Sequence, residues 1–280
     1  MRKTILLVLI IIPLITLNAV FDDYEPSPRA RALSGAFYSV SDDADAVFYN
    51  PAGLAYSDNN LRVSYTRRFN LDFSVLSSVA LAYRLPARWG TIGLGLLSHD
   101  VDYKDVSLLA EKQYALSHAI TLLADVHSEI QLGYTLNLYQ LGIESFGDQT
   151  SFGLNLGALA VLHQRTRLAF AITNLNNPRV GKDNRHDLPQ KMSMGISYRP
   201  YEEVNTSLEL RKGLNEDTEI RSGIEVKVLE ILDLRVGVRN KPVSYSAGLG
   251  IEVYNITLDY AFNTHATLSG THHLGLGYKF

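Results

Sequence analysis

Residues 130–138, Ile-Gln-Leu-Gly-Tyr-Thr-Leu-Asn-Leu, carry an apolar side chain at every second position, with a polar residue or glycine between. Successive side chains of a β-strand point to opposite faces, so this pattern predicts a strand with one apolar and one polar face. The same alternation recurs at 232–239, 254–262 and 274–280. Weaker versions fill most of the chain from residue 60 onward, giving about fourteen strands where a small sheet has only a handful.

Residues 60–280 are therefore predicted to form one β-domain. Dividing its roughly 220 residues among fourteen strands leaves about sixteen for each strand with its connection, and a membrane-spanning strand takes about 9–11. This arithmetic leaves no room for another domain.

Two architectures place one apolar and one polar face on every strand. A soluble sandwich buries the apolar face, whereas a transmembrane barrel turns it toward lipid and keeps the polar face within. Charged residues on the polar face suit either a lumen or a soluble surface, so they do not decide between the two. In the barrel, the lumen-facing charged residues are Glu209, Arg211, Arg221, Glu225, Lys227, Asp233, Arg235, Arg239 and Asp259.

The connections favour the barrel. If both termini are periplasmic, the predicted periplasmic connections are all short, at 86–89, 125–128, 163–166, 200–203, 229–230 and 252–253. The predicted external connections are mostly longer and more polar, at 99–113, 142–150, 174–190, 213–217 and 263–270. Short turns on one side and longer loops on the other are typical of outer-membrane barrels. We therefore predict an all-β protein, a fourteen-stranded antiparallel transmembrane β-barrel.

Residues 1–19 have the pattern of a secretory signal peptide. Arg2 and Lys3 precede an almost unbroken apolar stretch, and Ala19 is a small residue suited to cleavage. An N-terminal anchor helix is the alternative, which the short apolar core and Pro13 disfavour.

Residues 20–59 differ from the rest of the chain in their acidic clusters and prolines. Ser41 or Asp42 is predicted to cap a short helix that stops before Pro51, because a residue preceding proline is pushed out of the helical region. Val47, Phe48 and Tyr49 on this helix need a surface to pack against.

The composition excludes several classes of protein. The chain has no cysteine, which rules out disulfides and thiolate metal or redox sites. Its net charge of -3 gives no basic footprint for nucleic acid. A hydrophobic content of 46% argues against a helical membrane protein but not against a membrane barrel. In a barrel, apolar lipid-facing residues alternate with polar lumen-facing ones, so the mean composition is close to even.

We predict no catalytic residue, no cofactor and no metal site. Ser117 and His118 are neighbours on one strand, so their side chains point apart and cannot form a nucleophile–base pair. No Gly-x-Ser-x-Gly element is present. Asp183, His186 and Asp187, in a predicted external loop, carry side chains that could bind a divalent ion, but we do not predict a site there.

Several motifs resemble those of one family. The run from Arg31 to Phe37, then residues 42–44 (Asp-Asp-Ala) and 49–55 (Tyr-Asn-Pro-Ala-Gly-Leu-Ala), are similar to the start of the long-chain fatty acid transporter (FadL-like) superfamily. They look closest to its PorV/PorQ branch, associated with type IX secretion. Segments 172–175 (Ile-Thr-Asn-Leu), 187–189 (Asp-Leu-Pro) and 194–200 are similar to that branch too. Fourteen strands is also the family's number.

The resemblance implies that residues 20–59 fold into the lumen as a plug, called the hatch. Its motif would be Asn50, Pro51, Ala52 and Gly53, and its contacts with the wall would be Arg29, Arg31, Phe37, Phe48 and Tyr49. The two arginines are predicted to pair with lumenal carboxylates. Outer-membrane barrels commonly end on an aromatic residue of an alternating strand, so Tyr278 and Phe280 resemble their assembly signal.

The inward faces of the first seven predicted strands are small or apolar. They suit either a hydrophobic molecule in the lumen or packing against the hatch. These residues are Leu76, Ala80, Ala82, Ala115, Ala119, Leu123, Leu159, Val161, Ala169 and Ala171.

The family resemblance predicts a barrel that moves hydrophobic compounds across, or assists protein secretion at, the outer membrane of a diderm bacterium. A plugged structural or interaction barrel without transport is the alternative, and an enzyme is the third hypothesis. The expected partners are outer-membrane lipid, the barrel assembly machinery, and either a hydrophobic small molecule or secreted proteins.

Overall fold

The computed structural model describes residues 21, 24–86, 88–104, 106–143, 147–181, 186–214 and 216–280. The predicted signal peptide lies outside these residues, as does Asp183. Within the described part of the chain, no helix has the length and apolar composition needed to cross a membrane.

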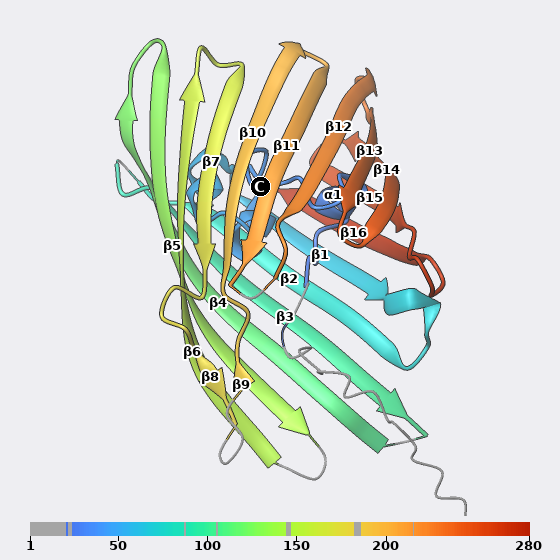
Figure 1. Cartoon of the computed structure of the whole chain (residues 1–280). Helices are drawn as coiled ribbons and strands as arrows, with labels where there is room; N and C mark the ends of the chain where they lie inside the picture. The colour runs from blue at the N-terminus through green and yellow to red at the C-terminus, as the bar shows by residue number, and fades with distance from the viewer. Residues whose placement is uncertain are drawn as a thin grey trace, which may run out of the picture.

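Fourteen strands form one closed antiparallel barrel (Figure 1). Neighbouring strands follow one another in sequence, with β7 beside β10 and β16 beside β1, so the sheet has no free edge. The predicted fourteen-stranded antiparallel barrel is confirmed. Its strands are β1 (Asn60–Arg67), β2 (Ser74–Arg84), β3 (Thr91–Tyr103), β4 (Val106–Ala124), β5 (Ser128–Ile143), β6 (Gly147–Leu162), β7 (Thr166–Thr173), β10 (Lys191–Tyr201), β11 (Val204–Gly213), β12 (Glu219–Leu229), β13 (Leu232–Asn240), β14 (Val243–Val253), β15 (Ile256–Asn263) and β16 (Thr271–Lys279).

The two ends of the barrel differ. The end that we call the turn end holds the short connections after β2, β4, β6, β10, β12 and β14. The opposite, loop end holds the connection 174–190, in which β8 (Arg179–Val180) and β9 (His186–Asp187) form a separate two-stranded sheet.

The prediction of external loops at 99–113 and 142–150 is wrong, because most of these residues belong to strands. β3 and β4 continue through most of 99–113, and β5 and β6 through most of 142–150, with antiparallel pairing such as Val101 opposite Leu109. The apolar alternation weakens there while the backbone pairing continues. Backbone hydrogen bonds alone therefore extend these strands beyond their sequence signal.

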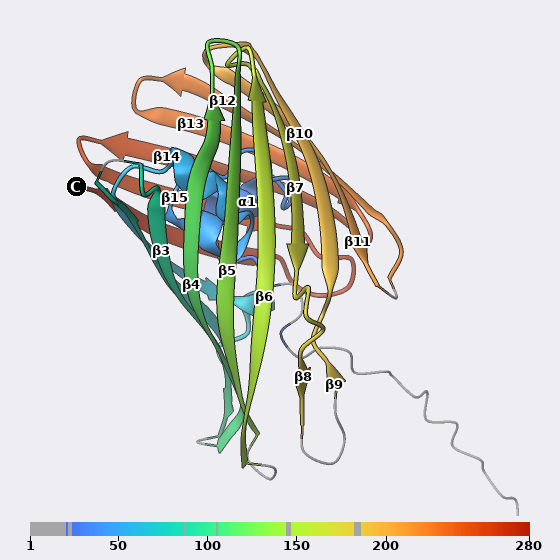
Figure 2. The same ribbon diagram turned by 90° about the vertical axis from the view of Figure 1, so that its left-hand side faces the viewer.

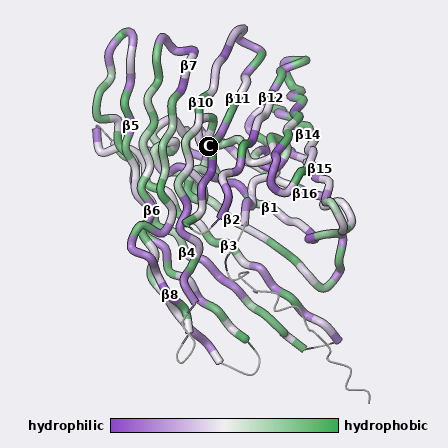
Figure 3. The backbone as a smooth tube through the Cα atoms, viewed as in Figure 1, coloured by the Kyte–Doolittle hydropathy of each residue, from purple (hydrophilic) through white to green (hydrophobic). Residues whose placement is uncertain are grey.

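The outer face of the barrel is apolar. In β5, Leu132, Tyr134 and Leu138 are exposed on the outside, while Gln131 and Asn137 are buried inside. Figure 3 shows hydrophobic and hydrophilic residues alternating along the strands. A closed barrel with apolar side chains outside and polar ones inside is the architecture of a membrane-spanning barrel, which excludes the soluble sandwich.

One predicted inward residue, Leu123, faces outward. The pairing of β4 with β5 is irregular between Thr121 and Leu123, so that Leu123 lies opposite the outward residue Ile130 and is exposed. An extra residue in one strand moves the following side chains to the other face. Period-two alternation cannot reveal such a shift within an unbroken apolar stretch.

Residues 24–58, which we call the inner segment, lie inside the barrel (Figure 2). They contain α1 (Pro28–Ala32) and two 3₁₀ helices, η1 (Ala44–Phe48) and η2 (Pro51–Tyr56). The predicted cap is wrong, because Asp43 rather than Ser41 or Asp42 caps η1, its side chain accepting from the Asp45 backbone N–H at 3.0 Å. The helix does end before Pro51, which begins η2 because its fixed φ suits a first helical turn.

Candidate functional site

The inner segment contacts the wall through two unlike faces. α1 packs against β13–β16, whereas η1 and η2 lie against β1–β6. On the second side the contact is apolar, with Val47 and Leu54 in one buried cluster with Ala80 and Ala115 of the wall. The inward apolar side chains of the early strands are therefore covered by the inner segment. Of the two interpretations, packing is the one that these contacts match.

Glycines of the wall make room for the backbone of the inner segment. A Cβ added at Gly133 would lie 2.5 Å from the Pro51 carbonyl carbon and 2.6 Å from the Ala52 nitrogen. A Cβ at Gly157 would overlap the Asn50 side chain and lie 2.8 Å from Pro51 Cδ. Other wall glycines that face the inner segment in the same way are Gly93, Gly95, Gly223, Gly237, Gly248 and Gly275.

Asn50 fixes the turn at Pro51 that packs against Gly133 and Gly157. Its Oδ1 accepts from the Ala52 backbone N–H at 3.2 Å, and its Nδ2 donates to the carbonyl oxygens of Tyr38 at 3.1 Å and Ala158 at 3.3 Å. One amide side chain thus caps η2, ties it to the preceding chain and anchors it to β6. This geometry accounts physically for Asn50-Pro51 in the motif, while Gly53 lies directly against the backbone of Ser41.

On the turn-end side, charged groups join the inner segment to the wall. Arg29 of α1 donates from Nε and Nη2 to the two carboxylate oxygens of Glu225 at 2.9 Å each, and from Nη1 to Asp42 at 2.7 Å. Arg167 on β7 also donates to Asp42, at 3.2 Å. The bidentate arginine–carboxylate geometry is the strong form of this interaction.

The pairs continue into a closed ring. Arg235 bridges Glu225 at 2.7 Å and Asp259 at 2.5 Å, and its side chain is only 3% exposed. Arg62 bridges Asp259 at 2.8 Å and Asp43 at 3.2 Å, and Asp43 lies 3.8 Å from Arg29. The members of this ion-pair ring are, in order, Arg29, Glu225, Arg235, Asp259, Arg62 and Asp43.

A second charged cluster lies nearer the loop end. Glu25 of the inner segment pairs with Arg211 at 2.8 Å, with Arg31 at 3.6 Å and with Arg221. Glu209 is buried and accepts from the backbone N–H groups of Phe37 and Tyr38, both at 3.2 Å.

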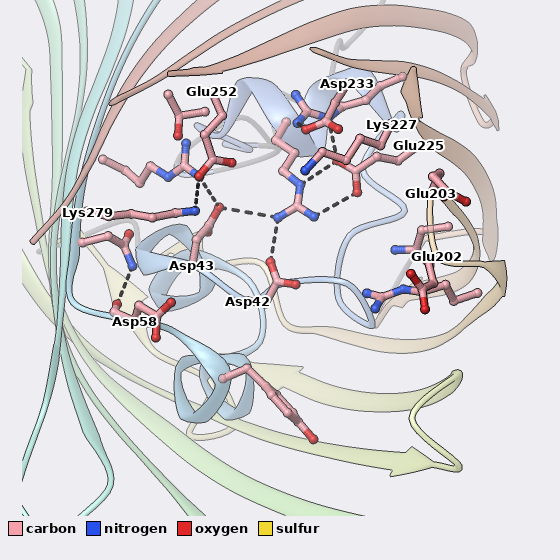
Figure 4. Close-up of a pocket in the computed structure, with 18 of the residues that line it drawn as sticks. Asp42, Asp43, Asp58, Glu202, Glu203, Glu225, Lys227, Asp233, Glu252 and Lys279 are labelled. Carbon is pink, nitrogen blue, oxygen red and sulfur yellow. Dashed lines mark hydrogen bonds and ion pairs between the residues drawn. The ribbon is translucent and has the colours of Figure 1, made fainter. Parts of the chain in front are cut away.

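A polar cavity of about 390 Å³ opens beside the ion-pair ring (Figure 4). Asp43 and Glu225 reach it from the ring, Asp42 lies beside them, and Glu202, Glu203 and Lys227 line it from the turn end. Cations and anions are interspersed on its walls. No single charge sign dominates, so the geometry does not favour a strongly anionic or cationic ligand.

A smaller cavity of about 50 Å³ lies at the loop end, above the inner segment. Aromatic side chains form part of its lining, together with the amides of Gln113, Asn155 and Asn174. Three charged residues, Glu25, Lys191 and Arg211, line it as well. Beside it, Glu111 accepts from the Phe21 backbone N–H at 2.8 Å and from the Tyr24 hydroxyl, which also contacts His99. The aromatic lining residues are Phe21, Tyr24, Tyr38, Phe48, Tyr49 and Tyr139.

Two carboxyl groups of the inner segment have shifted pKa values of opposite sign. Burial raises the pKa of Asp45 to about 7, and the nearby Asp43 carboxylate adds to the rise, while Arg62 opposes it without cancelling it. Burial would also raise the pKa of Asp42, but Arg29 and Arg167 outweigh it and lower that pKa.

We expect the Asp45→Asn variant to lose a pH dependence of stability. Asp45 keeps its proton up to about pH 7 in the folded protein, and in the unfolded chain only up to about pH 4. The free energy of unfolding therefore falls as pH rises from about 4 to about 7, by at most about 1.4 kcal/mol per pKa unit, and is flat above. Asp42 contributes a change of opposite sign, confined to pH below about 4.

Denaturant midpoints of the detergent-solubilised protein at about pH 5 and about pH 8 check this expectation. Stability should fall less between the lower and the higher pH in Asp45→Asn than in the parent chain, by the part that Asp45 contributes. Asp58→Asn, at an exposed position of the same segment, is the matched control and should behave as the parent. An unchanged pH dependence in Asp45→Asn would contradict the assignment.

The structure brings most of the predicted site residues together in these clusters. Arg29 pairs with Glu225 of the wall, whereas Arg31 pairs with Glu25 of the inner segment itself. Phe37 and Tyr49 lie in one buried cluster with Phe48 packed against it. Lys227 is exposed at the turn-end cavity, and Arg239 is half-buried on β13. Tyr278 and Phe280 stack on the outer face with ring centroids 6.2 Å apart, and their role in assembly stays a prediction.

Sequence reasoning missed the other halves of these ion pairs. Arg62 and Arg167 each stand at an inward position of a strand, where alternation could have indicated them. Glu25, Asp42 and Asp43 lie in irregular stretches of the inner segment, where no periodicity indicates a partner.

The side chains of Ser117 and His118 lie on opposite faces of the barrel wall. Ser117 is buried and shares a hydrogen bond with Thr135 at 2.7 Å, while His118 is outside, 2.7 Å from the Trp89 carbonyl oxygen. Among the described residues, no group of three or more metal-ligating side chains could hold an ion. The candidate Asp183 falls outside that part of the chain.

No family model and no curated protein sequence matches the chain. Solved structures do match it. The CymD monoaromatic hydrocarbon channel superposes with a TM-score of 0.64 at 12% identity, over 91% of this chain and 97% of that one. The chain shares the fold of this channel. A Pseudomonas aeruginosa FadL homologue gives 0.63 at 12% identity, over 91% and 98% of the two chains.

The toluene transporter TodX of Pseudomonas putida gives a TM-score of 0.60 at 12% identity, over 92% of this chain and 98% of that one. These channels are therefore similar to this chain along almost their whole length. At such low identity the likeness establishes the FadL-like barrel fold. It does not establish closeness to the PorV/PorQ branch.

Proposed function

We propose that this protein is an outer-membrane channel for small hydrophobic molecules in a diderm bacterium, with its turn end toward the periplasm, and that it performs no chemistry. The observation that carries the proposal is the aromatic-lined cavity at the loop end, in a barrel that shares its fold with hydrocarbon channels. The apolar outer face and the predicted signal peptide support the location.

The loop-end cavity suits a small ring better than a long chain. Six aromatic residues are part of its lining, and aromatic rings pack well edge to face, as Phe21 and Tyr139 already do with centroids 4.9 Å apart. At about 50 Å³ it is smaller than a cavity of about 150 Å³ that admits benzene, so binding requires its walls to move.

Uptake of toluene by asymmetric vesicles with lipopolysaccharide in the outer leaflet tests the proposal. Vesicles containing the protein should take up toluene several-fold faster than empty ones. Thr173→Phe, which fills the cavity, should slow uptake, while the matched control Thr206→Phe on the outward face of β11 should not. No difference between loaded and empty vesicles would refute transport.

A second candidate is a closed barrel that assists protein secretion or binds partners. The observation that favours it is the fit of the inner segment against Gly133 and Gly157, which leaves no space between the backbones. This hypothesis predicts capture of secreted proteins by the purified barrel together with no toluene uptake. Capture without uptake would replace the channel proposal, and uptake without capture would remove this candidate.

A further inference from the structure

The wall of the barrel carries a row of amide side chains at the loop-end cavity. Gln113 on β4, Asn137 on β5 and Asn155 on β6 are diagonal neighbours in the pairing of these three strands. Gln113 Nε2 donates to Asn137 Oδ1 at 2.9 Å, and Asn155 Oδ1 accepts from the Asn174 backbone N–H at 2.9 Å. Gln113 and Asn155 line the cavity directly.

This row has hydrogen-bonding capacity that the protein does not use. Asn155 is only 3% exposed, yet among the described residues nothing accepts a hydrogen bond from its Nδ2, and nothing donates to Gln113 Oε1. Asn137 Nδ2 is buried and likewise has no partner in the described part of the chain. Buried donors and acceptors without partners cost free energy, so a group that pairs with them in the cavity is favoured.

The inner segment contributes aromatic rings to the same cavity. Tyr38, Phe48 and Tyr49 line it, and the rings of Tyr38 and Tyr49 already pack edge to face with centroids 5.9 Å apart. Aromatic side chains favour a further ring in such an arrangement. A molecule with one ring and one hydrogen-bonding group therefore matches both the aromatic and the amide residues of the lining.

The charged residues of the lining already have partners of opposite charge. Arg211 lies 2.8 Å from Glu25, and Lys191 lies 3.9 Å from Glu216. A charged ligand would compete with these pairs and would bring a further charge out of water, which is unfavourable. The lining therefore favours an uncharged ligand.

We propose that the loop-end cavity selects uncharged aromatic molecules that carry a hydroxyl group, the phenol class, over plain hydrocarbons. Asn155 and Gln113 determine this specificity, because the hydroxyl accepts from Asn155 Nδ2 and donates to Gln113 Oε1 while the ring packs among the aromatic side chains. The inference rests on the proposed channel function and names the substrate class of that channel.

The size of the cavity adds to this preference. At about 50 Å³ it exceeds the roughly 10–15 Å³ that one water molecule needs, and its amides supply polar partners, so it is suited to hold water before a ligand enters. A hydrocarbon would displace that water without replacing its hydrogen bonds, whereas a hydroxyl group replaces them.

Calorimetric binding of p-cresol and toluene tests the preference, because the two molecules differ only by a hydroxyl group. p-Cresol, a phenol like the tyrosine side chain, is uncharged at neutral pH. With the protein in lipid nanodiscs and empty nanodiscs as the blank, the parent chain should bind p-cresol at least about tenfold more tightly than toluene. Equal binding of the two, or tighter binding of benzoate than of p-cresol, would overturn the proposal.

Two independent variants locate the preference. Asn155→Leu and Gln113→Met should each weaken p-cresol binding about tenfold, as expected when a hydrogen bond in a buried site is lost, and leave toluene binding unchanged. Gln131→Met is the matched control, because Gln131 is also a buried inward amide but bonds Tyr56 and is not part of the cavity lining. Variants that keep the parent preference while migrating as folded barrels on gels would refute these roles.

Vesicle uptake separates this inference from the proposed function. If vesicles take up toluene and p-cresol equally well and neither variant changes the ratio, the channel stands and the specificity is wrong. If p-cresol binds with the expected preference but vesicles take up neither compound, the cavity is a binding site and the channel function is wrong.

Discussion

The double variant Gly133→Ala/Gly157→Ala is expected to push the Pro51 turn off the wall while the barrel itself still forms. The two added methyl groups would occupy the space of the Pro51 backbone and the Asn50 side chain. At Gly133 the overlapping atoms are backbone, so no side chain can rotate away, and the inner segment must shift. Overpacking of this kind costs about 1–3 kcal/mol per site.

Limited proteolysis and heat-modifiable migration measure the two parts separately. The inner segment of the double variant should be cleaved much faster than in the parent, while the folded barrel band persists. Gly142→Ala is the matched control, because its added methyl would lie 3.1 Å from Asp148 Oδ1 and at an ordinary contact distance of 3.7 Å from Ala110. Equal cleavage of the parent and the double variant would show that the segment is not seated against these glycines.

The Arg235→Ala variant should be the most destabilising single substitution in the ion-pair ring. Arg235 is buried between Glu225 and Asp259, with Asp233 at 3.5 Å. Removing it leaves buried carboxylates without this cation, and breaking a buried pair in that way costs about 3–5 kcal/mol.

Arg67→Ala is the matched control. Arg67 pairs with Asp72 at 2.7 Å, but the two side chains are 52% and 88% exposed, and such surface pairs contribute only about 0–1 kcal/mol. Denaturant midpoints of the two variants in detergent should therefore differ widely. Similar midpoints would mean that the ring is too well hydrated to matter, and Arg235→Lys should recover only part of the loss.

Much of the barrel could be predicted from period-two alternation, because a lipid-facing surface forces an apolar residue at every second position. Where a strand is not constrained in this way, its sequence no longer shows clear alternation. The outer parts of β3–β6 are strands without clear alternation, and Leu123 follows an irregularity that leaves no trace in the sequence.

The site was harder to predict, because its geometry depends on partners distant in sequence. Glu225, Arg235 and Asp259 could be placed on the inward face from their own strands. Their pairing with one another through Arg29 and Arg62 follows only from barrel closure and from the path of an irregular segment. The alternating pattern showed glycines at inward positions. It did not show that the backbone of the inner segment packs against them.

The ion-pair ring also bears on the order in which the molecule can be completed. Arg29 lies near the beginning of the described chain, Arg62 is in the first strand, and Asp259 belongs to β15, the last strand but one. The ring therefore cannot close before nearly the whole wall is in place, since its contacts span most of the sequence. Its stabilisation arrives late in folding, as expected of contacts with large sequence separation. If the inner segment enters the barrel early, only its apolar contacts with β1–β6 can hold it at first. Arg29 can pair with Glu225 only after β12 has formed, and the ring can close only after β15 has added Asp259.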